Sequence, residues 1–140
     1  MIKGAGSDYT LTYIGRDADL AAFAFATSAT FTVAVGSVYM MAFSTFLGSA
    51  GGGVAFLPNP VIIATDRGEN LVDTVNNQRV TAYMSVSPTG AEALKPTDLL
   101  SVQFFNGIAT FQQLYINETG SPYKVSFLSD MVSYVCNVYI

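Results

Sequence analysis

Gly-Ser-Asp-Tyr-Thr-Leu-Thr-Tyr at residues 6–13 returns as Gly-Ser-Pro-Tyr-Lys-Val-Ser-Phe at residues 120–127, so the chain carries two copies of one alternating strand motif. A second match follows each copy. Residues 28–35 align with residues 133–140, after a connection about nine residues longer in the first copy. Each copy is typical of a strand pair, and only the second has a domain's length of sequence before it. The sequence therefore predicts an N-terminal hairpin followed by one complete unit.

The rest of the chain consists of short alternating segments separated by turn residues. Asn106-Gly107 is the strongest hairpin signal, and Gly68 is available for a positive φ in the turn at residues 66–70. Turn signals every eight to twelve residues or so, with no helical window, predict a β-sandwich. The expected strands cover residues 9–13, 23–35, 38–46, 54–57, 61–65, 79–86, 99–105, 108–116, 123–128 and 133–140, with a polar turn at 14–19.

Composition excludes several classes of function. Hydrophobic residues make up 51% of the 140-residue chain, charged residues only 11%, and the net charge is −4. A nucleic-acid partner is not expected, because phosphate binding needs a basic surface. Histidine is absent and Cys136 is the only cysteine, so the chain offers no internal disulfide, no zinc cluster and no serine or cysteine triad. The sequence thus predicts a protein that is not an enzyme.

No charged residue lies between Asp19 and Asp66. Such a run is long enough for a membrane span. Serine and threonine recur through it, however, and Phe31, Val33 and Val35 alternate with smaller or polar residues, which indicates strands. We therefore expect no membrane span. The first residues also lack the apolar core of a signal peptide before Asp8.

Three motifs resemble the tandem immunoglobulin-like repeats of large bacterial and protist surface proteins. They are the Asp66-Arg-Gly-Glu-Asn70 turn after a strand, the Asn106-Gly-Ile-Ala-Thr-Phe111 hairpin, and the Gly120-Ser-Pro-Tyr123 strand. The resemblance covers residues 38–140 and implies an immunoglobulin-like β-sandwich over residues 37–140. Residues 1–36 match the last two strands of a preceding repeat. The resemblance also implies an extracellular or cell-surface location.

The side chains that could carry chemistry have simpler interpretations. Asp17 with Asp19, or Asp66 with Glu69 and Asp73, could pair as catalytic carboxylates or bind calcium. Turn chemistry is the favoured interpretation, because Asp side chains bond their own backbone in tight loops and the spacing is not that of a calcium loop. Cofactors are therefore not expected. Cys136 is expected to point into the sandwich as a small buried hydrophobe.

Asn117-Glu118-Thr119 is the one glycosylation sequon. It precedes the Gly120 turn, where a surface glycan would fit. The sequence therefore marks Asn117 as the candidate N-glycosylation site.

The N-terminal hairpin suggests how the protein works. Two strands alone are marginally stable in water, so an apolar hairpin must pack on something. Since residues 38–140 are expected to hold their own closing strands, we expect the hairpin to dock on an identical subunit and build a head-to-tail filament. The residues expected at this contact are Tyr9, Leu11, Tyr13, Phe23, Phe25, Phe31, Val33 and Val35. The alternatives are a spacer or adhesive repeat cut from a long tandem surface protein, and a carbohydrate-binding module.

Overall fold

The structure is a computed structural model that describes residues 3–16, 22–48, 50–88, 94–131 and 135–140, and the described chain is almost entirely strand and turn. The N-terminal strands are β1 (Gly6–Tyr9), β2 (Thr12–Arg16), β3 (Ala22–Thr27) and β4 (Phe31–Val33). The later elements are β5 (Met40–Thr45), β6 (Val61–Thr65), β7 (Arg79–Val86), β8 (Leu94–Lys95), the 3₁₀ turn η1 (Thr97–Leu99), β9 (Ser101–Gln103), β10 (Ile108–Thr110), β11 (Tyr115–Ile116), β12 (Lys124–Ser129) and β13 (Val135–Tyr139). The prediction of an all-β chain is confirmed.

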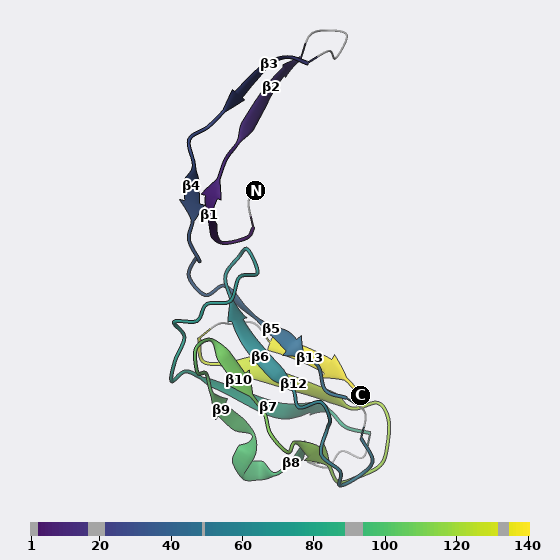
Figure 1. Ribbon diagram of the computed structural model, residues 1–140. Coiled ribbons are helices and arrows are strands. Elements are labelled where there is room, and N and C mark those ends of the chain that lie inside the picture. The colour runs from purple at the N-terminus through teal and green to yellow at the C-terminus, as the bar shows by residue number, and fades with distance from the viewer. Residues whose placement is uncertain (1–2, 17–21, 49, 89–93, 132–134) are drawn as a thin grey trace.

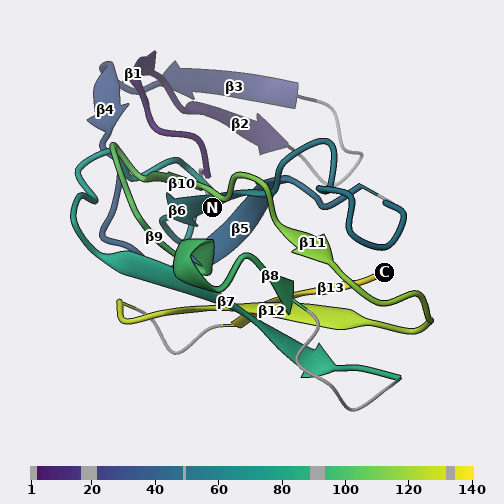
Figure 2. The ribbon, with the colours of Figure 1, turned by 90° about the horizontal axis from the view of Figure 1, so that it is seen from below.

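Two antiparallel sheets form a sandwich-like body from residues 38–140. One has the order β10-β6-β5 and the other β13-β12-β7-β9, and Figure 2 shows them as two layers. On one side of the sandwich the edge strands β5 and β13 lie together, because the thiol of Cys136 donates to the carbonyl oxygen of Met41 at 3.2 Å. β8 and β11 form a separate pair at the end of the body away from β1 and β4 (Figure 1).

The core lies between these two sheets and follows the two-residue period of strands. Val80 and Ala82 of β7 are buried between exposed neighbours. In β12, Val125 and Phe127 are fully buried and Leu128 is exposed, whereas Ser126 is buried as well, with its hydroxyl bonded to Ser85 and Asn137. Phe127 meets the rings of Phe111 and Phe43 edge-on, with centroids 5.0 and 5.4 Å apart. Edge-to-face rings add to the energy of their buried area, so Phe127 ties the two sheets together.

Cys136 lies half-buried on the inner side of β13, packed against this core. Its burial raises the pKa of the thiol, because an apolar environment disfavours the thiolate. Cys136 therefore serves as a small hydrophobe, as its alternation with the outward residues of the strand predicts.

The N-terminal strands form a separate two-stranded ribbon, which we call the arm and define as residues 3–36. β1 pairs with β4 and β2 pairs with β3, and Figure 1 shows the ribbon extending away from the body. Strands β3 and β4 of the arm, together with β5, lie within the stretch between Asp19 and Asp66 that has no charged residue. In the described residues, none of the helical structure is long and apolar enough to cross a membrane.

Both arm strands were expected to be continuous, and this is wrong. The first is interrupted at residues 10–11, between β1 and β2. β1 itself is irregular, because Asp8 has a φ of 60° and the register shifts between Gly6 and Tyr9. The second is broken at residues 28–30, where the hydroxyl of Ser28 accepts the backbone N–H of Leu11 at 3.0 Å. The polar turn expected from Ile14 is also misplaced, since β2 continues through Arg16.

The turn at Asn106-Gly107 has the expected backbone, with φ angles of 49° and 74°. Phe105 and Ile108 exchange two hydrogen bonds across it, at 2.8 and 3.0 Å. The prediction that residues 99–105 and 108–116 pair as one long hairpin is wrong, however, because β9 pairs with β7 in one sheet and β10 pairs with β6 in the other. The chain nevertheless stays in the core on both sides of the turn, since Phe104 and Ala109 are both buried.

Two other segments depart from the expected strands. Residues 54–57 form no strand, although Phe56 is buried and its N–H donates to the Leu114 carbonyl at 2.8 Å. The segment 108–116 is divided into β10 and β11, with Gln113 between them at a φ of 59°. In both places the chain follows the curved end of the sandwich rather than a straight sheet.

Candidate assembly surface

The arm exposes large apolar side chains along its length. Phe25 is 68% exposed and Tyr13 60% exposed, and Leu11, Ile14 and Val35 are also exposed. Of the other residues expected at the contact, Tyr9, Phe31 and Val33 are half-buried. Phe23 lies in β3, but its side chain is outside the described part of the structure. The described part of the arm is thus a ribbon with uncovered apolar groups.

These side chains occupy both faces of the ribbon. Ile14 lies directly opposite Phe25, and Tyr13 lies opposite Ala26. Directly opposed residues share a face, and successive residues alternate between faces. Ile14 and Phe25 therefore form one apolar pair, with Tyr13 on the reverse side. Ile14 was not among the expected contact residues because it was assigned to a turn, although its two-residue spacing from Thr12 could have placed it on the strand.

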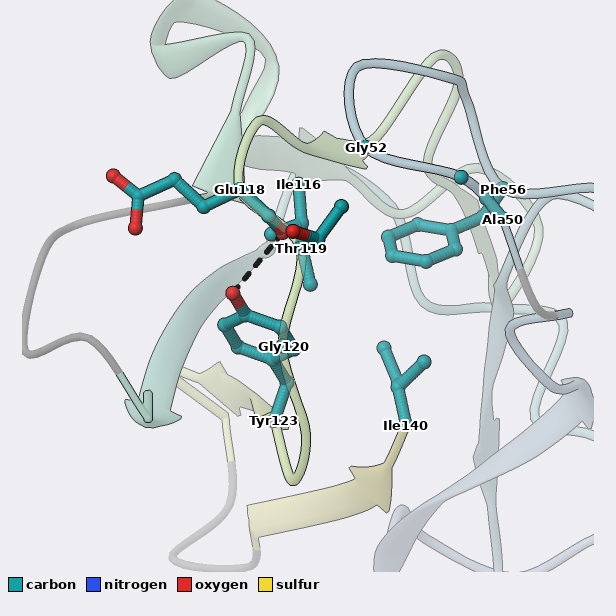
Figure 3. A pocket seen from close by; sticks show the side chains of 10 residues that line it. Ala50, Gly52, Phe56, Ile116, Glu118, Thr119, Gly120, Tyr123 and Ile140 are labelled. Carbon is teal, nitrogen blue, oxygen red and sulfur yellow. Dashed lines mark hydrogen bonds between the residues drawn. The ribbon is translucent and has the colours of Figure 1, made fainter.

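The repeated Gly-Ser-x-Tyr motif makes the same tyrosine contact in both copies, although the backbone at the x position differs, with a φ of 60° at Asp8 and a cis bond before Pro122. The Tyr9 hydroxyl donates to the carbonyl of Gly4 at 2.9 Å, and the Tyr123 hydroxyl donates to the carbonyl of Glu118 at 3.0 Å, as Figure 3 shows for the second copy. In each copy the tyrosine ring lies over the glycine three residues earlier. A side chain on that glycine would be 3.2 or 3.1 Å from the hydroxyl. The sequence repeat is therefore also a structural repeat.

The two copies differ in what surrounds the tyrosine. Tyr123 is 3% exposed, exchanges two 2.9 Å backbone hydrogen bonds with Ile140, and lies in a site that Phe56 also lines (Figure 3). Tyr9 is half-buried and lies opposite Phe31, with ring centroids 5.9 Å apart, instead of opposite Val35 as the repeat predicts. The arm copy therefore lacks the cover that the body provides for its own strand pair.

The arm is attached to the body through the carboxylate of Asp66, which is 5% exposed. One oxygen accepts the N–H of Gly36 at 2.8 Å, at the end of the arm. The other accepts the N–H groups of Gly68 and Asn70 at 2.8 and 3.0 Å, and the Asn70 amide also donates to both oxygens. A carboxylate with this many donors holds its neighbours firmly, since charge-assisted hydrogen bonds are the strong ones.

The other end of the arm is held by the same turn. The Asn70 amide donates to the Lys3 carbonyl at 2.6 Å and accepts the N–H of Ala5 at 2.9 Å. Any side chain on Gly68 would collide with the Lys3 carbonyl oxygen. The expectation of a positive φ at Gly68 is wrong, because Glu69 has the positive φ, 69°. Glycine is required at position 68 by this close approach.

We call the contacts of Asp66 and Asn70 with Gly36, Lys3 and Ala5 the root of the arm, and we expect this root to loosen in acid. The N–H of Gly36, then that of Asn70, hold the pKa of Asp66 at about 2, below its ordinary value of 3.8. A pKa lowered by folding adds stability above the unfolded value, and that stability is lost as the pH falls toward the folded value. Hydrogen exchange at the Gly36 amide should therefore accelerate between about pH 4 and pH 2, beyond the intrinsic pH effect.

The matched control for this titration is Asp66→Asn. That variant should show faster exchange at the Gly36 amide at neutral pH and no additional step in acid. Equal protection of this amide in both proteins at every pH would contradict the assigned role of Asp66.

The remaining candidates do not gather into a site. Within the described ranges, no three acidic or cysteine side chains lie close enough to hold a metal ion. The oxygens of Asp66 are used by the root of the arm, and Asp17 and Asp19 lie outside the described residues. Asn117 is exposed in the loop between β11 and β12, and its glycosylation stays a prediction.

Known proteins do not assign the chain to a family. No protein-family model matches it, and a search of curated proteins finds no similar sequence. The resemblance to tandem immunoglobulin-like repeats therefore stays a prediction, and the arm is the feature of the molecule that points to a function.

Proposed function

We propose that the protein is a structural subunit of an extracellular filament, in which the arm of each subunit docks on the next. The observation that carries this proposal is a ribbon whose described residues include large apolar side chains that its own body leaves uncovered, exemplified by Phe25 at 68% exposed. Exposed apolar patches of this kind mark interaction sites, and an isolated two-stranded ribbon gains stability by joining a larger sheet or core.

The root of the arm supports the same proposal. Asp66 and Asn70 hold both ends of the arm against the body, so its direction is set before any partner binds. Fixing the binding element in advance lowers the entropy lost on association. An arm that docks on a different surface of its partner makes a heterologous contact, and repeated heterologous contacts that do not close produce a filament.

Sedimentation velocity over a range of protein concentrations, followed by negative-stain electron microscopy, tests this function. The full chain should form larger species as concentration rises, and the end point should be filaments. A chain that begins at Ser37 should stay monomeric. Assembly of that shortened chain to the same extent as the full chain would contradict the proposal, as would a full chain that is monomeric throughout.

A spacer or adhesive repeat of a longer surface protein is the second candidate. The repeated tyrosine motif favours it, because the hydroxyl bond of Tyr9 copies that of Tyr123 and the arm then resembles the closing strands of a preceding unit. The intact mass of the native polypeptide separates the two candidates. A mass near 14.9 kDa supports separate subunits, and a mass several times larger supports an array.

A further inference from the structure

We propose that the groove between β9 and β10 of one copy of the chain receives the arm of a second copy. This inference rests on the proposed head-to-tail assembly and adds the surface that accepts the arm. The occupant is a second copy because the arm extends away from its own body, so β2 and β3 lie far from β9 and β10 of the same chain (Figure 1).

The groove lies where the two sheets end on the same side of the sandwich. β9 is an edge strand of the four-stranded sheet and β10 an edge strand of the three-stranded sheet. Two hollows of about 260 and 490 Å³ lie along these strands, and both are lined by Val102 and Thr110. Edge strands offer unpaired backbone groups, so the groove between β9 and β10 can accept both the backbone and the side chains of an added strand.

The lining of the groove is uncharged and combines exposed apolar side chains with polar ones such as Thr110 and Gln112. Phe105 is 73% exposed, and Leu99 and Ile108 are each 39% exposed. The backbone around Phe105 is held at the Asn106-Gly107 turn, where the N–H of Asn106 donates to the Asn76 side chain at 2.9 Å. None of the residues that line the two hollows is charged. A docked segment therefore meets three exposed apolar side chains among uncharged polar ones.

The arm matches this surface in chemistry. Its second half belongs to the uncharged stretch before Asp66, and β2 and β3 present the opposed pair Ile14 and Phe25, both exposed. Apolar side chains that cover one another gain free energy in proportion to the area removed from water, and none of the residues that line the two hollows adds the cost of burying a charge. The opposite side of the sandwich, which we call the opposite seam, is closed, since the Cys136 thiol of β13 donates to the Met41 carbonyl of β5.

Two variants of the full chain test the inference together. Phe25→Asp disables the arm and leaves the groove intact, and Phe105→Asp disables the groove and leaves the arm intact. Each variant alone should be monomeric at concentrations where the wild type assembles. Mixed in equal amounts, they should form a heterodimer of twice the 14.9 kDa monomer mass and nothing longer, because each pair then has one working arm and one working groove. Sedimentation equilibrium measures this mass.

Tyr139→Asp is the matched control. Tyr139 is 70% exposed on β13, at the opposite seam, and thus nearly as accessible as Phe105. This variant should assemble like the wild type, and thermal unfolding should show that all three variants fold. If Phe105→Asp assembles normally, or if Tyr139→Asp is the variant that blocks assembly, the groove is not the receiving surface although the filament proposal stands. A wild-type chain that never assembles overturns both.

Discussion

Phe25→Asp is expected to weaken self-association by roughly 100-fold or more. Burial of a phenylalanine side chain contributes about 1.5–3 kcal/mol, and a carboxylate in its place would have to be desolvated within an apolar contact. Phe25 is 68% exposed in the single chain, so the stability of the monomer should barely change. The dissociation constant from sedimentation experiments on the full chain measures the effect.

Phe25→Leu is the control for this prediction. Leucine keeps an apolar group opposite Ile14 and should raise the dissociation constant by about tenfold at most. If the aspartate variant associates as strongly as the wild type, the face of the arm that carries Ile14 and Phe25 is not part of the contact. In that case the other exposed residues of the arm, Leu11 and Val35, become the next positions to test.

Phe127→Ala is expected to lower the free energy of unfolding by about 4 kcal/mol. Truncation of a buried phenylalanine costs about 3–5 kcal/mol, because its apolar contacts are lost and a cavity remains. Phe127 is fully buried, and its ring contacts Phe111 and Phe43. Equilibrium urea unfolding of an arm-disabled monomer, carrying Phe25→Asp, measures the change without interference from assembly.

Leu128→Ala provides the comparison within the same strand. Leu128 is adjacent to Phe127 but points away from the core and is 46% exposed, so its truncation should cost less than about 1 kcal/mol. Equal losses for the two variants would mean that β12 does not have its inner and outer faces as assigned.

Local patterning was enough to locate the central strands. The expected bounds of residues 61–65 and 79–86 match β6 and β7, because each segment has clear strand residues between strong turn signals. Patterning failed at residues 99–116. There Asn106-Gly107 correctly predicted the turn, but local sequence does not show that the flanking strands pair with β7 and β6 instead of with each other.

The candidate site was predictable in part. Alternation identified Tyr13 and Phe25 as strand residues, and the repeated motif distinguished the arm from the rest of the chain. The root of the arm was not predictable, since the contact of Asn70 with Lys3 and Ala5 joins segments more than sixty residues apart. The groove was missed for the same reason, because Phe105 and Val102 were assigned to one long hairpin.

The sequence by itself determined that this protein is built of short strands, that it repeats one strand motif near its two ends, and that it lacks the residues of common catalytic triads. These properties depend on side-chain type and on spacing within a few residues. Only the tertiary structure decided that the first copy stands away from the body, that Asp66 anchors it, and that β9 and β10 form a groove. Those features depend on which distant segments pack together, because the same apolar alternation fits a strand in either sheet and an arm outside both.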